Sequence, residues 1–427
     1  MGRELAYDPY AFSTLDGIDP DAFLIAVYRV EAIGGEEPSK VAEALASETT
    51  TGTWLRVPTE TDGIRERSQG KALGVYEFPA EGGSRKFLAI VAHPLENFGE
   101  GAPIPMIMTG IAGEAYSMAS ASVKLVDLIM PKSLLREFKG PKFGIAGLRD
   151  LLRVSDRPLV GAIMKPKLGM SPREMAKICY EAAAGGADLI KDDEMQSNPP
   201  YCKREERLSA VMEAIDRGCE ESGKRCLYAL NITDEVDEMP EIAERMAQAG
   251  ANCLMVNYIT AGHSILRAIA EDPSIRIPIL AHPTMARALA RPERIGIGLP
   301  VLKKLARVCG ADIAVLSSPY GKLHQTFGEY FWSVQALRSP LGGIGASLPA
   351  IGGAVHPGLA PRHVGDLGVD FAMIAGGAVL GHPMGPRAGI RAMVQAAIAA
   401  ARGIALEEYA RDHEELRAAL ERWGIPG

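Results

Sequence analysis

The stretch LVGAIMKPKLGMSPREMAKICYEAAAGGADLIKDDE, residues 159–194, contains the repeating unit of the chain. It begins with a short aliphatic run that ends in polar residues and continues through a segment with the apolar spacing of a helix. It closes with a second aliphatic run that again ends in polar residues. A strand, a helix and a strand in this order are typical of parallel β-strands joined by a crossover helix.

The same unit recurs along the rest of the chain. Eight aliphatic runs alternate with helical stretches, and eight such units predict a closed (β/α)8 TIM barrel of the α/β class. The expected strands are 159–164, 187–191, 226–232, 253–258, 277–282, 313–318, 347–352 and 371–376. The expected helices include 171–184, 203–221, 239–249, 262–270, 299–308 and 361–367.

The first 140 residues have a different pattern. Strand-like runs at 23–30, 71–76 and 86–92 and a helix near 38–46 predict an N-terminal α+β domain, which we expect to be ferredoxin-like. Gly140-Pro141-Lys142 reads as a hinge, so the expected domains are residues 1–140 and 141–427. Terminal helices are expected at 386–402 and 406–423.

Composition excludes several classes of function. The chain has 427 residues, 46 Lys and Arg and 53 Asp and Glu, so its formal charge is −7. This mild acidity without a basic tract argues against nucleic acid as a partner. The longest uncharged stretch, residues 339–361, is interrupted by prolines and glycines, so no membrane span is expected, and the N-terminus does not resemble a secretory signal. We therefore expect a cytoplasmic protein whose six cysteines are reduced and mostly buried.

Charged residues follow the first two strands of the predicted barrel. Lys165 and Lys167 come after the first run, and Lys191, Asp193 and Glu194 end the second. In this fold the functional groups stand at the carboxyl ends of the strands, and carboxylate oxygens suit Mg²⁺. Each group taken alone is also compatible with a solvated charged turn. Their shared place at strand ends favours a metal site.

Other residues are expected at the same end of the barrel. His282 closes the fifth run, although an isolated histidine is more often structural than catalytic. Residues 317–322 after the sixth run have the composition of a loop that presents Lys322, and an ordinary turn is an equal alternative. Glycine pairs after the seventh and eighth runs predict a phosphorylated substrate, because glycine lets backbone N–H groups approach an anion; tight turns are the weaker explanation. The pairs are Gly352-Gly353 and Gly376-Gly377.

Several motifs resemble the large subunit of ribulose-bisphosphate carboxylase. They are KPKLG (165–169), GGADLIKDDE (185–194), Gly321-Lys322, Gly381-His382-Pro383 and ETTTGTW (48–54), and the likeness extends in order over nearly the whole chain. Other motifs are more similar to carboxylase-like proteins that do not fix carbon, such as the diketo-methylthiopentyl-phosphate enolases. These motifs are GPKFGI (140–145), AHP (281–283), SPYG (318–321) and RWG (422–424).

The resemblance implies a role for each matching residue. It implies that Lys191 reacts with CO₂ to form a carbamate, which binds Mg²⁺ together with Asp193 and Glu194. It also implies that Lys165 transfers a proton, that Lys167 polarises a substrate oxygen, that Lys322 is a lid lysine and that His282 lies beside the reacting carbons. The implied phosphate contacts are Gly352, Gly353, Gly376, Gly377, Thr53 and Trp54. Glu48, Thr53 and Trp54 come from the other subunit in this family, so a homodimer with composite sites is implied.

The departures from the carboxylases narrow the function. Pro283 and Val315 replace an arginine and a histidine that hold the second phosphate of a bisphosphate, so a monophosphorylated substrate is implied. Ile351 and Glu114 replace a serine and an asparagine, which argues against carboxylation of ribulose bisphosphate. The enolases place their base lysine at the position of Glu114 and lack Lys322, so the chain departs from them too. Glu114 could pair with a site lysine, act as an acid or base, or be an ordinary surface carboxylate.

Three functions remain open. The first is a Mg²⁺-dependent decarboxylase or C–C hydrolase, or a transcarboxylase, acting on a 3-oxo sugar acid phosphate such as 3-oxo-isoapionate 4-phosphate. The second is a 2,3-diketo-5-methylthiopentyl-1-phosphate enolase or a related sugar-phosphate isomerase. The third is a non-catalytic sugar-phosphate binder, which the retention of the site lysines and carboxylates makes the weakest.

Overall fold

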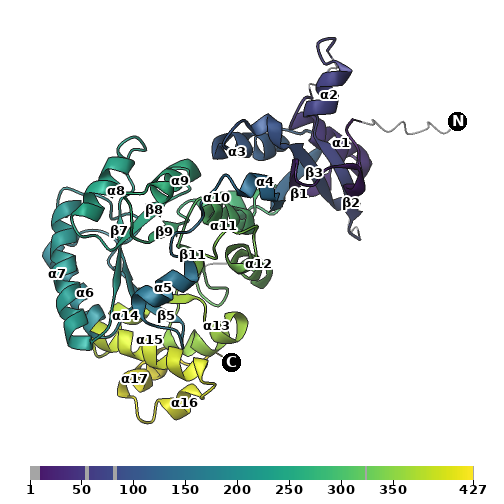
Figure 1. Ribbon diagram of the computed structural model, residues 1–427. Helices are drawn as coiled ribbons and strands as arrows, with labels where there is room; N and C mark the ends of the chain where they lie inside the picture. The colour runs from purple at the N-terminus through teal and green to yellow at the C-terminus, as the bar shows by residue number, and fades with distance from the viewer. Residues whose placement is uncertain (1–9, 53–56, 80–83, 323–324, 427) are drawn as a thin grey trace. The chain divides into compact units, whose positions relative to one another are not determined.

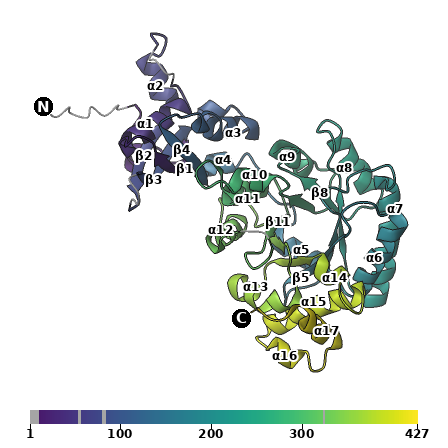
Figure 2. The same ribbon diagram turned by 180° about the vertical axis from the view of Figure 1, so that it is seen from behind.

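A computed structural model describes residues 10–52, 57–79, 84–322 and 325–426. The chain forms two compact units, which Figures 1 and 2 show from opposite sides. The first unit comprises Met1–Lys139, Met285–Leu305 and Pro340–Ile344. The second comprises Gly140–Thr284, Ala306–Ser339 and Gly345–Gly427. None of the helices in the described part of the chain is long and apolar enough to cross a membrane.

The first unit is built on a five-stranded sheet with the order β10-β4-β1-β3-β2. Strand β1 pairs antiparallel with both β3 and β4, and the two-residue β10 pairs parallel with β4. The expected α+β architecture is confirmed, whereas β4 and β10 were not predicted. The strands are β1 (Phe23–Ala32), β2 (Lys71–Glu77), β3 (Lys86–Pro94), β4 (Ala121–Ile129) and β10 (Gly296–Ile297). The helices are η1 (Leu15–Gly17), α1 (Pro38–Glu48), α2 (Asp62–Ser68), η2 (Leu95–Phe98), α3 (Ile104–Ala112), η3 (Glu114–Tyr116), α4 (Lys132–Leu135) and α10 (Ala286–Ala290).

The second unit contains the predicted barrel. Eight parallel strands close in the order β11-β12-β13-β5-β6-β7-β8-β9, and each of the eight aliphatic runs supplies one of them. The barrel strands are β5 (Leu159–Ile163), β6 (Leu189–Lys191), β7 (Leu227–Asn231), β8 (Cys253–Asn257), β9 (Ile279–His282), β11 (Ile313–Ser317), β12 (Leu348–Gly352) and β13 (Ala372–Ala375). The TIM-barrel prediction is therefore confirmed.

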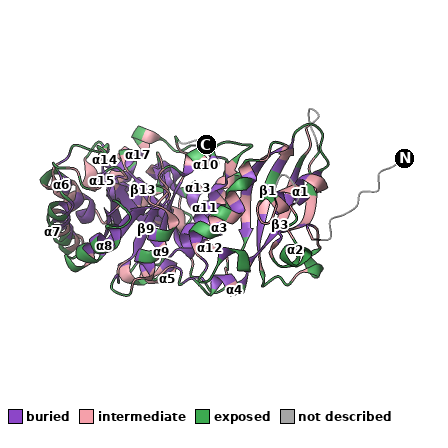
Figure 3. Ribbon diagram, turned by 90° about the horizontal axis from the view of Figure 1, so that it is seen from above, coloured by how far each residue is buried: buried purple, intermediate pink, exposed green. Residues whose placement is uncertain are grey.

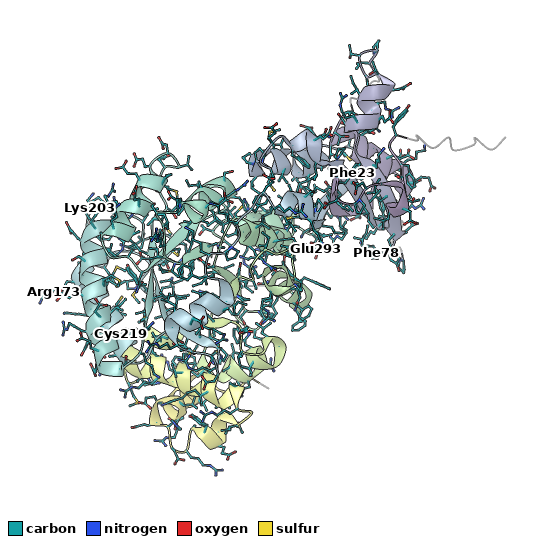
Figure 4. The ribbon with its side chains drawn as sticks, viewed as in Figure 1. Phe23, Phe78, Arg173, Lys203, Cys219 and Glu293 are labelled. Carbon is teal, nitrogen blue, oxygen red and sulfur yellow. The ribbon has the colours of Figure 1, made fainter. Side chains whose placement is uncertain are left out.

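Helices surround the barrel on the outside (Figure 1). Figure 4 labels Arg173 and Lys203, two exposed residues that project from this helical layer. Helix α6 begins with a capping box, in which Ser171 and Glu174 satisfy backbone donors that the first turn leaves free. The helices of the second unit are α5 (Gly144–Leu152), α6 (Pro172–Ala184), α7 (Arg204–Ser222), α8 (Met239–Gln248), α9 (His263–Glu271), α12 (Phe327–Arg338), η4 (Pro357–Leu359), α13 (Ala360–Leu367), α14 (Gly377–Leu380), α15 (Pro386–Ala401), α16 (Leu406–Tyr409) and α17 (Glu414–Trp423). Helix α11 (Leu299–Val308) belongs to the first unit as far as Leu305.

The core of the second unit lies inside the barrel, and Figure 3 shows the strands as mostly buried. Apolar side chains from all eight strands meet there, and Leu148 and Leu152 of α5 join them. Burial of each large aliphatic side chain contributes about 1.5–3 kcal/mol, so the barrel interior is a packed core that leaves the strand ends to carry polar groups. All six cysteines are free thiols and five are buried, as expected.

The chain end differs from the prediction. A single helix was expected over 406–423, but the structure has two, α16 and α17, separated by residues 410–413. The ring Nδ1 of His413 lies 2.7 Å from the carbonyl oxygen of Tyr409, and the backbone at His413 is extended. The His413 side chain thus takes the carbonyl that a continuous helix would have paired with a backbone N–H, and the helix ends there.

Candidate active site

The register of β5 and β6 brings the predicted lysines and carboxylates together. Ile163 pairs with Lys191, so Lys165 and Asp193 each lie two residues beyond a paired position on neighbouring strands. The ammonium group of Lys165 donates to Oδ2 of Asp193, which is fully buried. A buried carboxylate requires such a partner, because burial of an unpaired charge is costly.

Glu194 is the centre of a second group of contacts. Its Oε1 lies 3.3 Å from Nζ of Lys167, and its Oε2 lies 3.7 Å from Nε2 of His282 and 4.0 Å from Nζ of Lys191. Burial alone would raise the pKa of Glu194, but His282, a backbone hydrogen bond and the two lysines outweigh it and lower the pKa to about 2. Glu194 is therefore ionised at neutral pH, the form in which its oxygens can bind a cation.

Lys191 is almost completely buried and donates a 2.7 Å hydrogen bond to the carbonyl oxygen of Asp192. Burial lowers the pKa of Lys191 to about 8, although Glu194, Asp193 and Asp192 oppose the shift. A substantial fraction of the amine is therefore neutral near pH 8, and the neutral amine is the form that can attack an electrophile such as CO₂.

The oxygen ligands at this cluster suit Mg²⁺ only if the amine of Lys191 is acylated. Among the described residues, no three His, Cys, Asp or Glu side chains are grouped so that they could hold a metal ion. The cluster supplies two carboxylates, Asp193 and Glu194, beside the Lys191 amine. A third anionic oxygen ligand arises only if that amine is acylated, and three such oxygens match the preference of Mg²⁺. The residues present therefore fit a carbamate-dependent Mg²⁺ site.

Asp192 supports the segment between Lys191 and Asp193. Its carboxylate is fully buried and accepts hydrogen bonds from the hydroxyl of Tyr228 at 2.5 Å, the backbone N–H of Asn231 at 2.9 Å and Nε of Arg207 at 3.2 Å. These bonds hold the end of β6 against β7 and α7. Asp192 thus faces away from the cluster while its two neighbours enter it.

Polar residues that the sequence analysis did not name orient the site. Asn231 and Asn257 donate from Nδ2 to the carbonyl oxygen of Glu194 at 3.1 and 2.9 Å. Thr284 donates to Oδ1 of Asn257 at 3.2 Å and lies 2.8 Å from Nδ1 of His282. Asn231 and Asn257 end β7 and β8, so the strand-end rule applied to these runs could have identified them. No local signal points to Thr284.

The glycine pairs lie beside the lysines. A Cβ atom on Gly376 would stand 3.1 Å from Cγ of Lys165, and one on Gly321 would stand 1.8 Å from the carbonyl oxygen of Gly353. The loop that carries the exposed Lys322 therefore packs directly on the backbone of the first glycine pair, which ends β12. Gly353 has φ +85°, a conformation that favours glycine.

The structure also locates the remaining predicted residues. Glu48 and Glu114 belong to the first unit, where Glu48 is the last residue of α1, Glu114 is the first of η3, and both are exposed. Thr53 and Trp54 lie outside the described residues. Val315 and Ile351 are buried, and Val315 belongs to the apolar barrel core. Neither side chain can donate a hydrogen bond to a phosphate.

Known proteins are similar to this chain over nearly its whole length. The model of the ribulose bisphosphate carboxylase large chain catalytic domain matches residues 144–423, and that of its N-terminal domain matches residues 14–134. The chain is 42% identical over 417 residues to a ribulose bisphosphate carboxylase-like protein of Archaeoglobus fulgidus, covering 95% of this chain and 94% of that protein.

Two solved structures are similar over nearly their whole lengths. The dimeric archaeal Rubisco of Hyperthermus butylicus has a TM-score of 0.86 and 33% identity, covering 97% of this chain and 98% of that one. The rubisco-like protein MtnW of Alicyclobacillus acidocaldarius has a TM-score of 0.85 and 34% identity, covering 94% of this chain and 100% of that one.

Proposed function

Because this chain belongs to the ribulose-bisphosphate carboxylase large-chain family, we propose that it is a Mg²⁺-dependent enzyme that breaks a C–C bond in a monophosphorylated 3-oxo acid. The best candidate substrate is a 3-oxo sugar acid phosphate such as 3-oxo-isoapionate 4-phosphate. The observation that carries the proposal is the contact of Lys165 with Asp193, beside Lys191 and Glu194, in a barrel whose Pro283 and Val315 cannot bind a second phosphate.

Mg²⁺ and a carbamylated lysine are general features of this family. In this chain Asp193, Glu194 and carbamylated Lys191 would hold the ion. When bound, it would supply positive charge that stabilises an enolate oxygen of the substrate.

The lysines then have separate tasks. The electrostatic effect of Glu194, a hydrogen bond from Lys167 to it and the charge of Asp193 raise the pKa of Lys167. Lys167 therefore stays cationic and donates to a substrate oxygen. Lys165, bound to Asp193, is positioned to deliver a proton.

The site residues and water account for every bond that forms or breaks in the proposed reaction. In decarboxylation the C–C bond to the carboxylate breaks, CO₂ leaves, and the electron pair forms the enolate of the 3-oxo group. The ammonium group of Lys165 then protonates the enolate carbon. In the hydrolytic variant, water adds to the 3-oxo carbon and the bond between that carbon and C2 breaks instead. The 3-oxo carbon becomes a carboxylic acid, and C2, which keeps the original carboxylate, takes up a proton.

The phosphate would bind to the backbone of Gly352, Gly353, Gly376 and Gly377. A second phosphate would lie near Pro283 and Val315, whose side chains offer no hydrogen-bond donors, and a buried phosphate without donors is strongly destabilised. The substrate is therefore expected to carry a single phosphate. We also propose that the N-terminal domain, residues 1–140, supplies Glu48, Thr53 and Trp54 to the site of a partner subunit in a homodimer, with the barrel in residues 141–427. The similarity to a dimeric archaeal Rubisco supports this assembly.

A tautomerase or enolase acting on 2,3-diketo-5-methylthiopentyl 1-phosphate is the second candidate. The AHP and SPYG motifs and the similarity to the Alicyclobacillus rubisco-like protein favour it. Lys165 would then exchange a proton at carbon, and no C–C bond would break. A non-catalytic binder of sugar phosphates is the third candidate.

One experiment separates the three. The purified protein is incubated with Mg²⁺ and bicarbonate, in D₂O, with each of the two substrates. Release of CO₂ or of two cleavage products from 3-oxo-isoapionate 4-phosphate supports the proposal. Deuterium incorporation into the diketone without cleavage supports the enolase, whereas saturable binding without either reaction supports the binder. If the protein is an enzyme, the Lys191→Ala variant should lose Mg²⁺-dependent turnover. If the protein is only a binder, the variant should bind the sugar phosphate as well as the parent does.

A further inference from the structure

His363 lies beneath the segment that carries Lys322. It is a fully buried residue of α13, and it belongs to none of the groups described above. Its Nε2 lies 3.1 Å from Oγ of Ser318 and its Nδ1 lies 3.1 Å from the hydroxyl of Tyr330. Ser318 and Tyr330 are both buried and stand on either side of Lys322 in the sequence. One imidazole thus connects Ser318, which precedes Lys322, to Tyr330, which follows it.

The chemistry of the imidazole suits this bridge. Burial lowers the pKa of His363 to about 4, and the neighbouring His356 adds to the shift, so the ring is neutral at physiological pH. A neutral imidazole has one N–H donor and one acceptor nitrogen. Because hydroxyls both donate and accept, either tautomer satisfies both partners.

Further contacts hold the first end of the segment in a fixed shape. Ser318 donates its backbone N–H to the carbonyl oxygen of Gly352 at 2.9 Å, and its Oγ accepts from the backbone N–H of Tyr320 at 3.1 Å. The Tyr320 hydroxyl donates to Asp366 of α13 at 2.9 Å, and its ring packs on His363. Gly321 meets the carbonyl of Gly353. The loop is therefore held to both α13 and the glycine pair.

We propose that His363 is a positioning residue: by tying Ser318 to Tyr330 it fixes the loop against Gly352-Gly353 and so sets where Lys322 is presented. This inference rests on the proposed function, because it takes Lys322 to act on a substrate whose phosphate binds that glycine pair. His363 itself does not contact the substrate.

The test uses hydrogen–deuterium exchange of the full-length protein, read on peptides that cover residues 317–322. Loss of the bridge in His363→Leu should speed exchange at Tyr320 and Gly321 by about tenfold, the effect of roughly one lost hydrogen bond. His363→Gln, which can keep one of the two bonds, and Tyr330→Phe should give intermediate rates. The matched control is Tyr180→Phe, which removes a tyrosine hydroxyl bonded to Glu221 on the outside of the barrel and should leave these rates unchanged.

Unchanged exchange in His363→Leu, or exchange that rises equally across all barrel peptides, overturns the proposal. If His363→Leu does not fold, the proposal is overturned by unchanged exchange in Tyr330→Phe. These readouts need no substrate, so they remain decisive if the proposed function fails. Where turnover is measurable, His363→Leu should lower kcat, and the double variant with Lys322→Ala should be no slower than Lys322→Ala alone. If the loss of kcat in the double variant equals the product of the two single-variant losses, His363 does not act by positioning Lys322.

Discussion

Thr284 fixes the proton on the ring of His282. The Nδ2 group of Asn257 donates to the carbonyl of Glu194, so Oδ1 of Asn257 is free to accept the hydroxyl proton of Thr284. The Thr284 oxygen must then accept from Nδ1 of His282, 2.8 Å away. Nδ1 of His282 therefore carries a proton, and Nε2 lies 3.7 Å from the Glu194 carboxylate.

Replacing Thr284 tests this relationship. Thr284→Val keeps the shape of the side chain but removes the hydroxyl, and we expect kcat/KM to fall about tenfold, the effect of roughly one hydrogen bond. Thr284→Ser should retain most of the activity. Nitrogen-15 chemical shifts of His282 should move toward the other tautomer in the valine variant. Unaltered shifts and unaltered kinetics would show that the hydroxyl does not orient the ring.

The reaction of Lys191 with CO₂ should depend on pH. Because the pKa of Lys191 is about 8, its neutral fraction rises about tenfold between pH 7 and pH 9. At constant dissolved CO₂, the rate of carbamate formation should rise by the same factor and level off above pH 9. Carbon-13 NMR with labelled CO₂ and Mg²⁺ measures it. Lys203→Ala, which removes an exposed lysine, should keep the signal, and Lys191→Ala should lose it. A rate that is flat across this range would contradict the prediction.

Gly321→Ala should disturb two loops at once. The new Cβ would stand 1.8 Å from the carbonyl oxygen of Gly353, so one backbone must move. We expect weaker binding of the phosphorylated substrate and a loss of Lys322-dependent turnover of about tenfold or more, measured by steady-state kinetics.

The control for this substitution is Gly328→Ala, seven residues further along in α12. A Cβ at Gly328 meets nothing within 4 Å, and alanine in a helix is about 0.5–1 kcal/mol better than glycine. This variant should be as active as the parent and no less stable. Equal kinetics for the two alanine variants would refute the contact between the loops.

The ion pair of Arg207 and Asp192 should matter for stability. Both side chains are fully buried, so Arg207→Met leaves a buried carboxylate without its cation and should lower the free energy of unfolding by about 3–5 kcal/mol. Arg245 pairs with Glu205 at the surface, and Arg245→Met should cost less than about 1 kcal/mol. Urea unfolding of the two variants measures both values, and similar losses would contradict the argument.

The barrel could be predicted from sequence because its signal is local. Each strand is a short aliphatic run between helices, and the strand-end positions of Lys165, Asp193 and Glu194 predict their proximity, which the structure shows. Strand β10 could not be predicted in this way, because its two residues become a strand only by pairing with β4, far away in the sequence.

His363 and Thr284 could not be predicted either, because their roles depend on contacts with distant segments. His363 lies in an ordinary amphipathic helix, and its partners are 45 and 33 residues away, at Ser318 and Tyr330. Thr284 follows a strand end by two residues and has no distinctive neighbours. Roles that depend on contacts between distant segments leave no pattern in a single sequence.

The enclosure of the Lys191 amine acts as a size filter. Only 1% of this residue is exposed, whereas Lys167 and Lys322 are exposed at the end of the barrel. A slender linear gas can approach a recessed nitrogen that bulky reagents cannot reach. Aldehydes and active esters should therefore label the outer lysines first, whereas Lys191 should react only with electrophiles as small as CO₂.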